Sequence, residues 1–346
     1  MNNKKEVNRM RYMGLDVHKD NIAACVMNAG GKTVKHLEVR ASERGLQMLH
    51  DHMKTAEYCV MMESSTYSYK TYRFFESLGV EAHVVHARGL KTITDSDKKT
   101  DKRDAEAIGR YLRLWKKGEI ELSMSFIPTP EQCALKDICR YKEELSSKIG
   151  DDTRRIRSHM ARNLEDLPEQ YDRMSVKASR EYIRNTWPDD MTLMERMDQY
   201  EVLLEESEKV KKEVESRLPG DKNVKFLETI PGIARQTGVQ VMSMIIDIRR
   251  FESPEKLCAY FGMVPRVRDS GGKEKHGHMT KTGDEMMRKI MERVTLSHIL
   301  HCDSSVKEFY DRKAKEMGEK KALISASRKM LALIWSVLTN ERPFRA

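Results

Sequence analysis

The sequence predicts an α/β domain at the N-terminus, followed by long helical arms and a mostly α-helical C-terminal domain. Over residues 11–117, short apolar runs alternate with helical stretches, which is typical of strands and helices layered in an α/β fold. Apolar residues then recur at helical spacing over residues 129–164 and 193–218, up to the break at Pro219-Gly220. We therefore expect three domains, at residues 11–125, 126–221 and 222–346.

The N-terminal strands are predicted from short strand-like runs, rich in apolar residues, that are separated by turns. Gly30-Gly31 marks one such turn, and Gly79 ends a helix expected over Tyr67 to Leu78. The five runs are Tyr12–Val17, Asn21–Met27, Thr33–Val39, Glu57–Met62 and Val80–Val85. Three hairpin-linked strands followed by parallel additions fit an RNase H-like sheet with helices on its faces.

Acidic residues stand at the ends of two of these strands and at the start of a helix. Asp16 lies inside an apolar run, where an unpaired carboxylate costs on the order of several kcal/mol, and Glu63 ends another run. Asp101 and Asp104 lie one helical turn apart at the start of a helix. Taken singly, each acid is explained as a strand end facing water or as a partner of the helix dipole. Together they form the hard oxygen ligands that a Mg²⁺ site for phosphate chemistry requires.

The charge of the chain favours a polyanionic partner. The net charge is +9 and the isoelectric point about 9.1, and lysine and arginine can neutralise phosphates and release counterions. This composition does not separate DNA from RNA. Beside the acidic helix start we expect a basic group to contact nucleic-acid phosphates, although such a charge run is also typical of a solvated face. This group is Lys98, Lys99, Lys102 and Arg103.

The stretch Tyr260–Gly283 is rich in glycine and basic residues and nearly free of apolar residues in its second half. We expect an exposed loop that leads into a helix beginning near Asp284. Ser270 is followed by Gly271 and Gly272, so a phosphate can approach both the hydroxyl and the flexible backbone closely; a plain linker is the alternative. Basic residues of the loop and of the next helix are expected to stabilise charge on that phosphate. They are Arg266, Arg268, Lys273, Lys275, Lys281 and Arg288.

The two long charged helices of the arms carry apolar seams, which favours an antiparallel hairpin or a dimerising coiled coil. Beyond the arms, the Pro231-Gly232 turn precedes an apolar helix and resembles a helix-hairpin-helix element. Such a turn can present backbone N–H groups to a phosphate. A plain helix–helix turn is the alternative.

The cysteines and the apolar runs predict a cytoplasmic protein without a membrane span. None of the six cysteines forms a Cys-x-x-Cys pair, so we expect them to be reduced. The first residues show no apolar signal region, and the most apolar run, Met330–Leu338, is too short to span a bilayer. His298, His301 and Cys302 lie along one helix, where such residues more often belong to the core or the surface than to a zinc site.

The acids fall in three short segments, Gly14–Lys19, Met62–Ser65 and Lys99–Ala105. These segments resemble the three acidic motifs of the RuvC-like DEDD domain in insertion-sequence transposases of the IS110 and IS1111 groups. The segments Gly262–Pro265, Ser270–Lys273 and Gly277–Lys281 resemble the C-terminal transposase domain of the same family. The resemblance extends from about residue 11 to about residue 300.

The resemblance implies that Asp16, Glu63, Asp101 and Asp104 bind Mg²⁺. It also implies that Ser270 is the nucleophile of a DNA transposase that forms a phosphoserine intermediate. In this family the site combines the acidic domain of one subunit with the serine domain of another, which implies a homodimer or a homotetramer. A structured bridge RNA would pair with donor and target DNA and so supply the sequence specificity.

Two other functions remain open. A RuvC-like metal-dependent DNA hydrolase would use the same four carboxylates with water as the nucleophile, and would not need Ser270. A non-catalytic RNA-binding scaffold would use only the basic surfaces. The complete set of acids argues against the scaffold, and the serine loop argues against the hydrolase.

Overall fold

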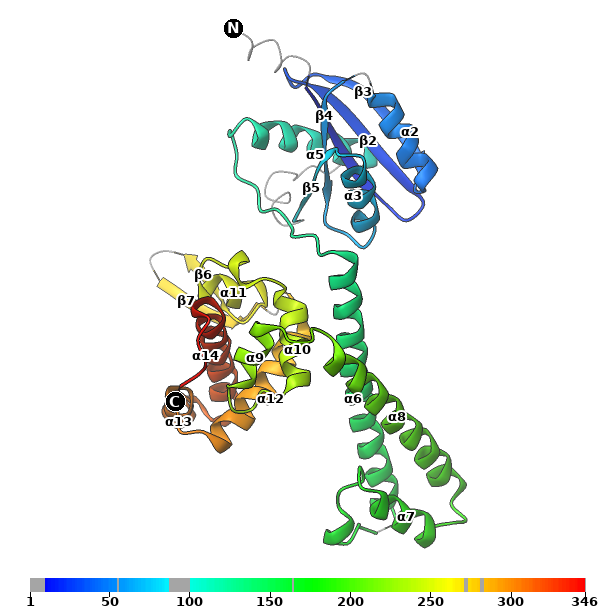
Figure 1. Cartoon of the computed structure of the whole chain (residues 1–346), viewed down its shortest axis with the longest axis vertical. Coiled ribbons are helices and arrows are strands. Elements are labelled where there is room, and N and C mark those ends of the chain that lie inside the picture. The colour runs from blue at the N-terminus through cyan, green and yellow to red at the C-terminus, as the bar shows by residue number, and fades with distance from the viewer. Residues whose placement is uncertain are drawn as a thin grey trace. The chain divides into compact units, whose positions relative to one another are not determined.

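The computed structural model describes residues 10–54, 56–86, 100–163, 165–270, 273–280 and 283–345. For residues 266–270 and 273–278 it describes the backbone alone. The chain forms two compact units, Met1–Ile127 and Pro128–Ala346, and each has its own hydrophobic core. Unit 1 is built on a sheet, whereas unit 2 is mostly helical (Figure 1).

Unit 1 contains a mixed five-stranded sheet with the strand order β3-β2-β1-β4-β5 (Figure 1). Strands β1, β2 and β3 are antiparallel neighbours, and β4 and β5 run parallel to β1. The bounds are β1 Arg11–Val17, β2 Asn21–Asn28, β3 Thr33–Arg40, β4 Tyr58–Glu63 and β5 Glu81–Val85. The five strands expected from the apolar runs are therefore confirmed.

Alternating side chains bury the two faces of this sheet against different helices. The helices are α2 Glu43–Met53, α3 Ser68–Ser77 and α5 Asp101–Lys116. On one face, Leu15 shares a buried cluster with Leu49 of α2 and Phe75 of α3. On the other face, Met61 shares a second cluster with Leu112 of α5. The sheet is thus the middle of three layers, with α5 on the face opposite α2 and α3.

Unit 2 begins with an antiparallel helical hairpin. Its elements are α6 Pro130–Ala161, η1 Glu169–Tyr171, α7 Lys177–Thr186 and α8 Met191–Ser216. Thr129 caps α6 through reciprocal hydrogen bonds with Gln132, and Pro130 fits the first helical turn. Met160 of α6 and Leu193 of α8 share one buried cluster. The antiparallel hairpin, one of the two arrangements expected, is therefore confirmed within a single chain.

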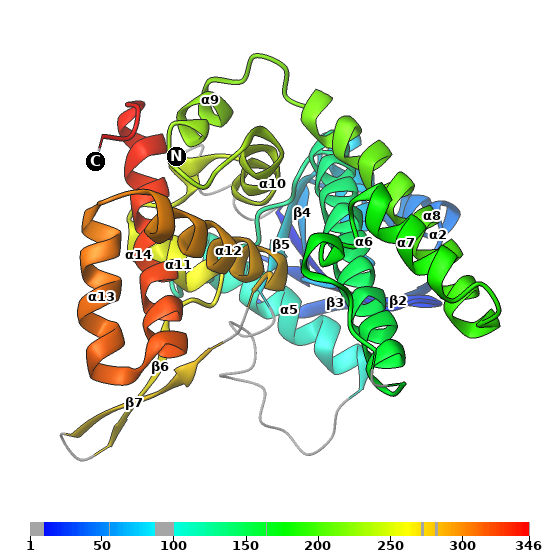
Figure 2. The same cartoon turned by 90° about the horizontal axis from the view of Figure 1, so that it is seen from below.

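The rest of unit 2 is a helical body whose main core joins α10, α12 and α14. Its elements are α9 Lys222–Glu228, α10 Arg235–Ile245, η2 Ile248–Arg250, α11 Pro254–Tyr260, β6 Pro265–Ser270, β7 Lys273–Met279, α12 Glu285–His301, α13 Ser305–Met317 and α14 Glu319–Asn340. Figure 2 shows α12, α13 and α14 packed as neighbours, in agreement with the contacts among them.

Helix α14 contains the apolar run Met330–Leu338 but is longer than that run. By length and composition alone it is the one helix, within the described part of the chain, that is long and apolar enough to cross a membrane. However, 44% of its most apolar window is buried inside the protein. Met330, Leu331 and Ile334 lie in the main core of unit 2. Such a buried face is typical of a core helix.

The glycine-rich stretch before α12 corrects one expectation. We expected an exposed loop there, but β6 and β7 form a two-stranded antiparallel sheet in which Ser270 pairs with Lys273. The loop prediction was wrong because it relied on the scarcity of apolar residues. A two-stranded ribbon can form through backbone pairing around a two-residue Gly-Gly connection, which is itself a hairpin signal.

Candidate metal site

Asp16 and Glu63 lie at the same edge of the sheet of unit 1. Leu15 pairs with Met62 in the parallel register of β1 and β4, so Asp16 and Glu63 are the next residues on the two strands. Leu15 and Met62 are buried on the side of α2 and α3. Because side chains alternate along a strand, Asp16 and Glu63 face the opposite side, where α5 lies.

Helix α5 brings two more acids to this edge. Asp101 and Asp104 lie in its first turn, where the positive end of the helix dipole favours carboxylates. The helix crosses β1 at two glycines: a Cβ atom on Gly14 would lie only 2.2 Å from the backbone nitrogen of Gly109. The absence of side chains at this crossing lets the backbone of α5 lie directly on β1.

Three donor groups meet at this edge. The Nε2 atom of His18 lies 3.0 Å from the Oδ2 atom of Asp16 and 3.8 Å from the Oδ1 atom of Asp101. One donor atom from each of the three residues lies within 4.8 Å of the other two. Among the residues that the structure describes, this is the one group of three or more His, Cys, Asp or Glu donors with that spacing, and Glu63 and Asp104 lie outside it.

His18 was not predicted as a site residue. It stands two residues after Asp16 and directly after the end of β1, in the segment that carries the family resemblance. That spacing was the available signal. The predicted ligands were carboxylates alone, so the imidazole was not among them.

The electrostatics of Asp16 favour a bound cation. Burial raises the pKa of the Asp16 carboxyl, His18 lowers it through its charge and hydrogen bond, and Asp104 and Asp101 raise it again by repulsion. The net pKa lies above the ordinary value. A cation relieves both the loss of hydration and the crowding of negative charge.

The chemistry of the donors fits a divalent metal. Asp16 and Asp101 offer the hard oxygen atoms that Mg²⁺ and Mn²⁺ prefer, and the His18 imidazole also suits transition metals. The Asp16 side chain is 14% exposed and that of Asp101 is 53% exposed, so the group is open to a ligand from solvent on the α5 side.

Ser270, the predicted nucleophile, is the last residue of β6 in unit 2. Its backbone is described but its side chain is not. The same holds for Arg266, Arg268, Lys273 and Lys275, whose side chains are not described either. Several predicted contacts fall outside the described residues altogether: Lys98, Lys99, Gly271, Gly272 and Lys281.

The other predicted basic residues have different surroundings. Lys102 and Arg103 are exposed in the first turn of α5, next to Asp101. Arg288 is half-buried, and its Nη1 atom donates hydrogen bonds to the carbonyl oxygens of Phe261 and Gly283, both at 3.2 Å. Arg288 thus ties together backbone segments that precede α12.

The Pro231-Gly232 turn packs against α12. The Nδ1 atom of buried His298 lies 2.8 Å from the Pro231 carbonyl oxygen, and its Nε2 atom lies 2.8 Å from the Ser304 hydroxyl. Gly232 has a φ of +98°, and a Cβ there would lie 2.9 Å from the Val294 carbonyl oxygen. One imidazole nitrogen of His298 therefore contacts this turn, and the other contacts the N-cap residue of α13.

Comparisons with known proteins match both units. A family model of transposases with the DEDD domain of IS110 matches residues 13–163, and the model described as the transposase IS116/IS110/IS902 family matches residues 224–311. The transposase of IS1111A from Coxiella burnetii is 21% identical over 99% of this chain and 93% of its own length. That of IS1328 from Yersinia enterocolitica is 22% identical over 96% and 98%. A pilin gene-inverting protein of Moraxella lacunata is 27% identical over 34% of this chain and 38% of its own.

The matched models lie in the expected order along the chain, and two curated transposases align with nearly all of it. Transposases recombine DNA, and the DEDD domain implies dependence on a divalent metal. The chain belongs to the IS116/IS110/IS902 family of transposases.

Proposed function

We propose that the protein is the recombinase of an insertion sequence, which cuts and rejoins DNA strands through a phosphoserine intermediate under the guidance of a structured bridge RNA. In this proposal unit 1 is an RNase H-like (RuvC-like) domain. The observation that carries it is the meeting of Asp16, His18 and Asp101 where the start of α5 lies beside the end of β1. The sheet order β3-β2-β1-β4-β5 supports the fold assignment.

The proposed metal ligands are Asp16, Glu63, Asp101 and Asp104. When bound there, Mg²⁺ would polarise the scissile phosphate and help to deprotonate the Ser270 hydroxyl. His18 orients the Asp16 carboxylate through their 3.0 Å contact or serves as a further ligand. Exposed Lys102 and Arg103 hold the phosphates that flank the scissile bond.

Ser270 is the proposed nucleophile. Its Oγ atom attacks phosphorus and forms an O–P bond, while the bond between phosphorus and the leaving strand oxygen breaks. The hydroxyl proton passes to a base, and the leaving oxygen takes up a proton. Attack by the hydroxyl of a new strand then reverses the exchange and releases Ser270. Because one phosphodiester is exchanged for another through the phosphoserine, no external energy source is needed.

The partners in this proposal are donor DNA, target DNA and the structured RNA. Base pairing supplies the sequence specificity, while the protein binds RNA shape and phosphates. The net charge of +9 supports a polyanionic partner and predicts an affinity that falls steeply with salt. The active assembly is a homodimer or homotetramer that works in the cytoplasm, with the acids of one subunit and Ser270 of another at each site.

One experiment separates recombinase, hydrolase and scaffold. The full-length protein is incubated with Mg²⁺, its guide RNA and end-labelled DNA, and the products are resolved on a denaturing gel. The recombinase predicts label bound covalently to protein, which is lost in Ser270→Ala. Cleavage that survives Ser270→Ala would support the hydrolase, and no reaction with any of these partners would support the scaffold.

Asp16→Asn and Asp104→Asn test the acids in the same assay. Both variants should abolish strand cleavage and leave RNA affinity nearly unchanged, because only the metal site is altered. Asp20→Asn, which changes an exposed carboxylate between β1 and β2, is the matched control and should cleave normally. Normal cleavage by Asp16→Asn would remove that residue from the site.

A further inference from the structure

A groove lies between α2 and α3, on the face of the sheet opposite α5. Its volume is about 880 Å³. Val17 and Ile22 of the sheet and Leu46 of α2 form an apolar floor. Nothing in the proposed phosphoryl transfer uses this space, although it lies within the unit that carries the acids.

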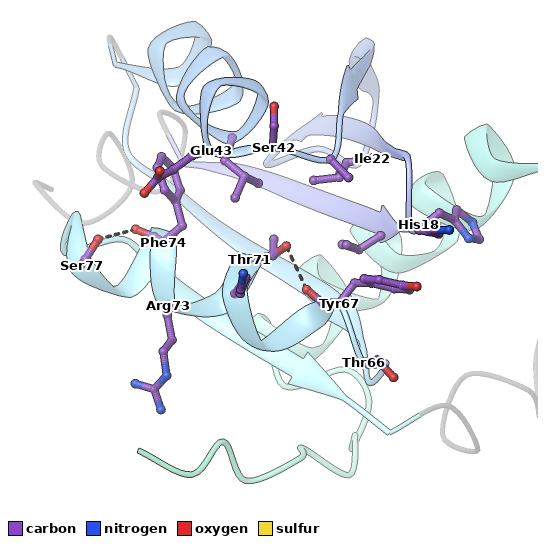
Figure 3. Close-up of a pocket in the computed structure, with 15 residues that line it drawn as sticks. His18, Ile22, Ser42, Glu43, Thr66, Tyr67, Thr71, Arg73, Phe74 and Ser77 are labelled. Carbon is purple, nitrogen blue, oxygen red and sulfur yellow. Dashed lines mark hydrogen bonds between the residues drawn. The ribbon is translucent and has the colours of Figure 1, made fainter. Parts of the chain in front are cut away.

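The chemistry of the groove differs between its two ends. In Figure 3, His18 and the ring of Tyr67 lie at one end, and Glu43, Phe74 and Ser77 lie at the other. Tyr67 is 44% exposed, so part of this aromatic residue is open to a ligand. The Tyr67 carbonyl accepts a hydrogen bond from Thr71 Oγ1 at 3.3 Å, which fixes the start of α3 (Figure 3).

Two ammonium groups also line the groove. Lys19 and Lys70 are exposed, and neither forms an ion pair with a residue that the structure describes. Arg73, by contrast, lies 3.4 Å from Glu76 and points away from α2 in Figure 3. Among the described residues that line the groove, Glu43 is the one carboxylate, and it lies at the end away from His18.

The aromatic ring, the apolar floor and the two lysines of the groove favour one class of ligand. An exposed aromatic ring above an apolar floor, with two unpaired cations, matches a ligand that carries both a flat ring and a phosphate. A nucleotide has both. A second copy of this chain is a poorer match, because each copy carries a net charge of +9 and the groove itself is cationic.

The groove is continuous with the acidic group through one residue. His18 lines the groove, and its Nε2 atom lies 3.0 Å from the Asp16 carboxylate. The groove and the acids lie on opposite faces of the sheet but meet at the end of β1, so a DNA strand whose phosphate lies at the acids can reach the groove with a neighbouring nucleotide. This step rests on the proposed function, since it takes the acids to hold a phosphate of DNA.

We propose that the groove between α2 and α3 binds an unpaired nucleotide of the strand held at the acidic group. The base packs against the Tyr67 ring over the apolar floor, and its phosphate pairs with Lys19 and Lys70. The groove thereby fixes which phosphate of an unpaired strand stands at Asp16. Paired DNA does not fit this role, because its bases are already stacked and covered.

Binding of a defined probe tests the groove without cleavage. Fluorescence anisotropy of full-length protein with a labelled oligothymidylate of about twelve nucleotides, in the absence of divalent metal, gives the affinity for unpaired DNA. Tyr67→Ala should weaken binding about tenfold, and Tyr67→Phe should bind like the wild type because the ring remains. Tyr69→Ala is the matched control: this residue is also an exposed tyrosine of α3, 40% exposed, but lies outside the groove lining.

Two further measurements test the lysines of the groove and the contact between the nucleotide and Tyr67. Lys19→Ala combined with Lys70→Ala should reduce the salt dependence of binding by about two released counterions. Irradiation of an oligonucleotide that contains iodouracil should crosslink it to the peptide that carries Tyr67.

Equal affinities for Tyr67→Ala and Tyr69→Ala would overturn the proposal, as would a crosslink found only on other peptides. A change of oligomeric state in Tyr67→Ala at unchanged oligonucleotide affinity would assign the groove to a second copy. Asp16→Asn separates this test from that of the proposed function. It should lose cleavage but keep oligothymidylate binding, so each proposal can fail without the other.

Discussion

Gly14 of β1 and Gly109 of α5 lie backbone against backbone. A Cβ atom on Gly14 would lie 2.2 Å from both the Gly109 nitrogen and the Ala105 carbonyl oxygen. A Cβ on Gly109 would meet the Gly14 nitrogen at 3.2 Å, a tight contact but a less severe one. This crossing sets the height of α5 above the sheet, and with it the approach of Asp101 to Asp16.

Gly14→Ala should therefore destabilise unit 1 and displace the start of α5. The new methyl group meets backbone atoms that cannot move away cheaply, so we expect a loss of about 3 kcal/mol in the free energy of unfolding. Urea denaturation gives the loss, and hydrogen exchange locates it in β1 and α5.

Gly150→Ala is the matched control for this substitution. Gly150 lies within α6, where the nearest atom to an added Cβ is a side-chain nitrogen of Arg154 at 3.6 Å. This change should raise stability by about 0.5–1 kcal/mol, because alanine favours helix. Equal effects of the two substitutions would show that the crossing does not require a glycine at position 14.

Divalent metal should stabilise the protein through the acidic group. Metal that binds the folded state alone raises the free energy of unfolding by about 2.7 kcal/mol at one hundred times its dissociation constant. We expect Mg²⁺ and Mn²⁺ to raise the melting temperature of the wild type and of Asp20→Asn, but not that of Asp16→Asn. Thermal scans with increasing metal measure this, and a normal rise in Asp16→Asn would contradict it.

His18 should affect the two metals differently. If its imidazole is a ligand, His18→Ala weakens Mn²⁺ binding more than Mg²⁺ binding, because nitrogen donors suit transition metals better. If His18 only orients Asp16, both affinities fall by a similar factor. Calorimetric titration of the variant with each metal distinguishes these roles.

The sequence predicted most elements of unit 1 but not how they combine. Apolar residues located all five strands of the sheet, because four of them bury apolar side chains and β3 packs its partly buried Leu37 and Val39 against the core. Helix α2 was not predicted, since its buried apolar side chains are only Leu46, Leu49 and Met53 among charged neighbours. The nearness of Asp101 to Asp16 depends on the crossing at Gly14, which is a tertiary contact. No spacing along the chain specifies that contact.

The six cysteines should divide into two classes of reactivity. Cys25, Cys59, Cys139 and Cys258 are buried, whereas Cys133 and Cys302 are partly exposed. Burial raises the pKa of the Cys59 thiol to about 12 and those of Cys139 and Cys258 to about 11. Since the thiolate is the reactive form, iodoacetamide should label Cys133 and Cys302 in the native protein and all six after denaturation. Mass spectrometry of the labelled peptides checks this.

Asp284 joins the arm to the body of unit 2. Its carboxylate caps α12 by accepting a hydrogen bond from the Met286 nitrogen, and it lies 2.8 Å from Arg140 and 3.2 Å from Lys136, both on α6. Burial alone would raise the pKa of Asp284, but the hydrogen bond from Arg140 and the charge of Lys136 outweigh it. The pKa therefore lies below the ordinary value.

Asp284→Asn should lower the free energy of unfolding at neutral pH by about 1 kcal/mol, because asparagine keeps the helix cap but loses the ion pairs with Arg140 and Lys136. The loss is modest because Arg140 is half exposed, so solvent screens its charge. A carboxyl whose folded pKa is depressed contributes stability above its unfolded pKa of about 3.9 and loses it as pH falls through the folded value. The difference between wild type and variant in the free energy of unfolding should therefore be full at neutral pH and shrink in acid.

Urea unfolding across this pH range measures the difference. The control variant is Asp303→Asn, which changes a fully exposed i,i+4 partner of Lys307 and should alter stability little. A constant difference down to about pH 2 would mean that the charge of Asp284 does not hold α6 to α12.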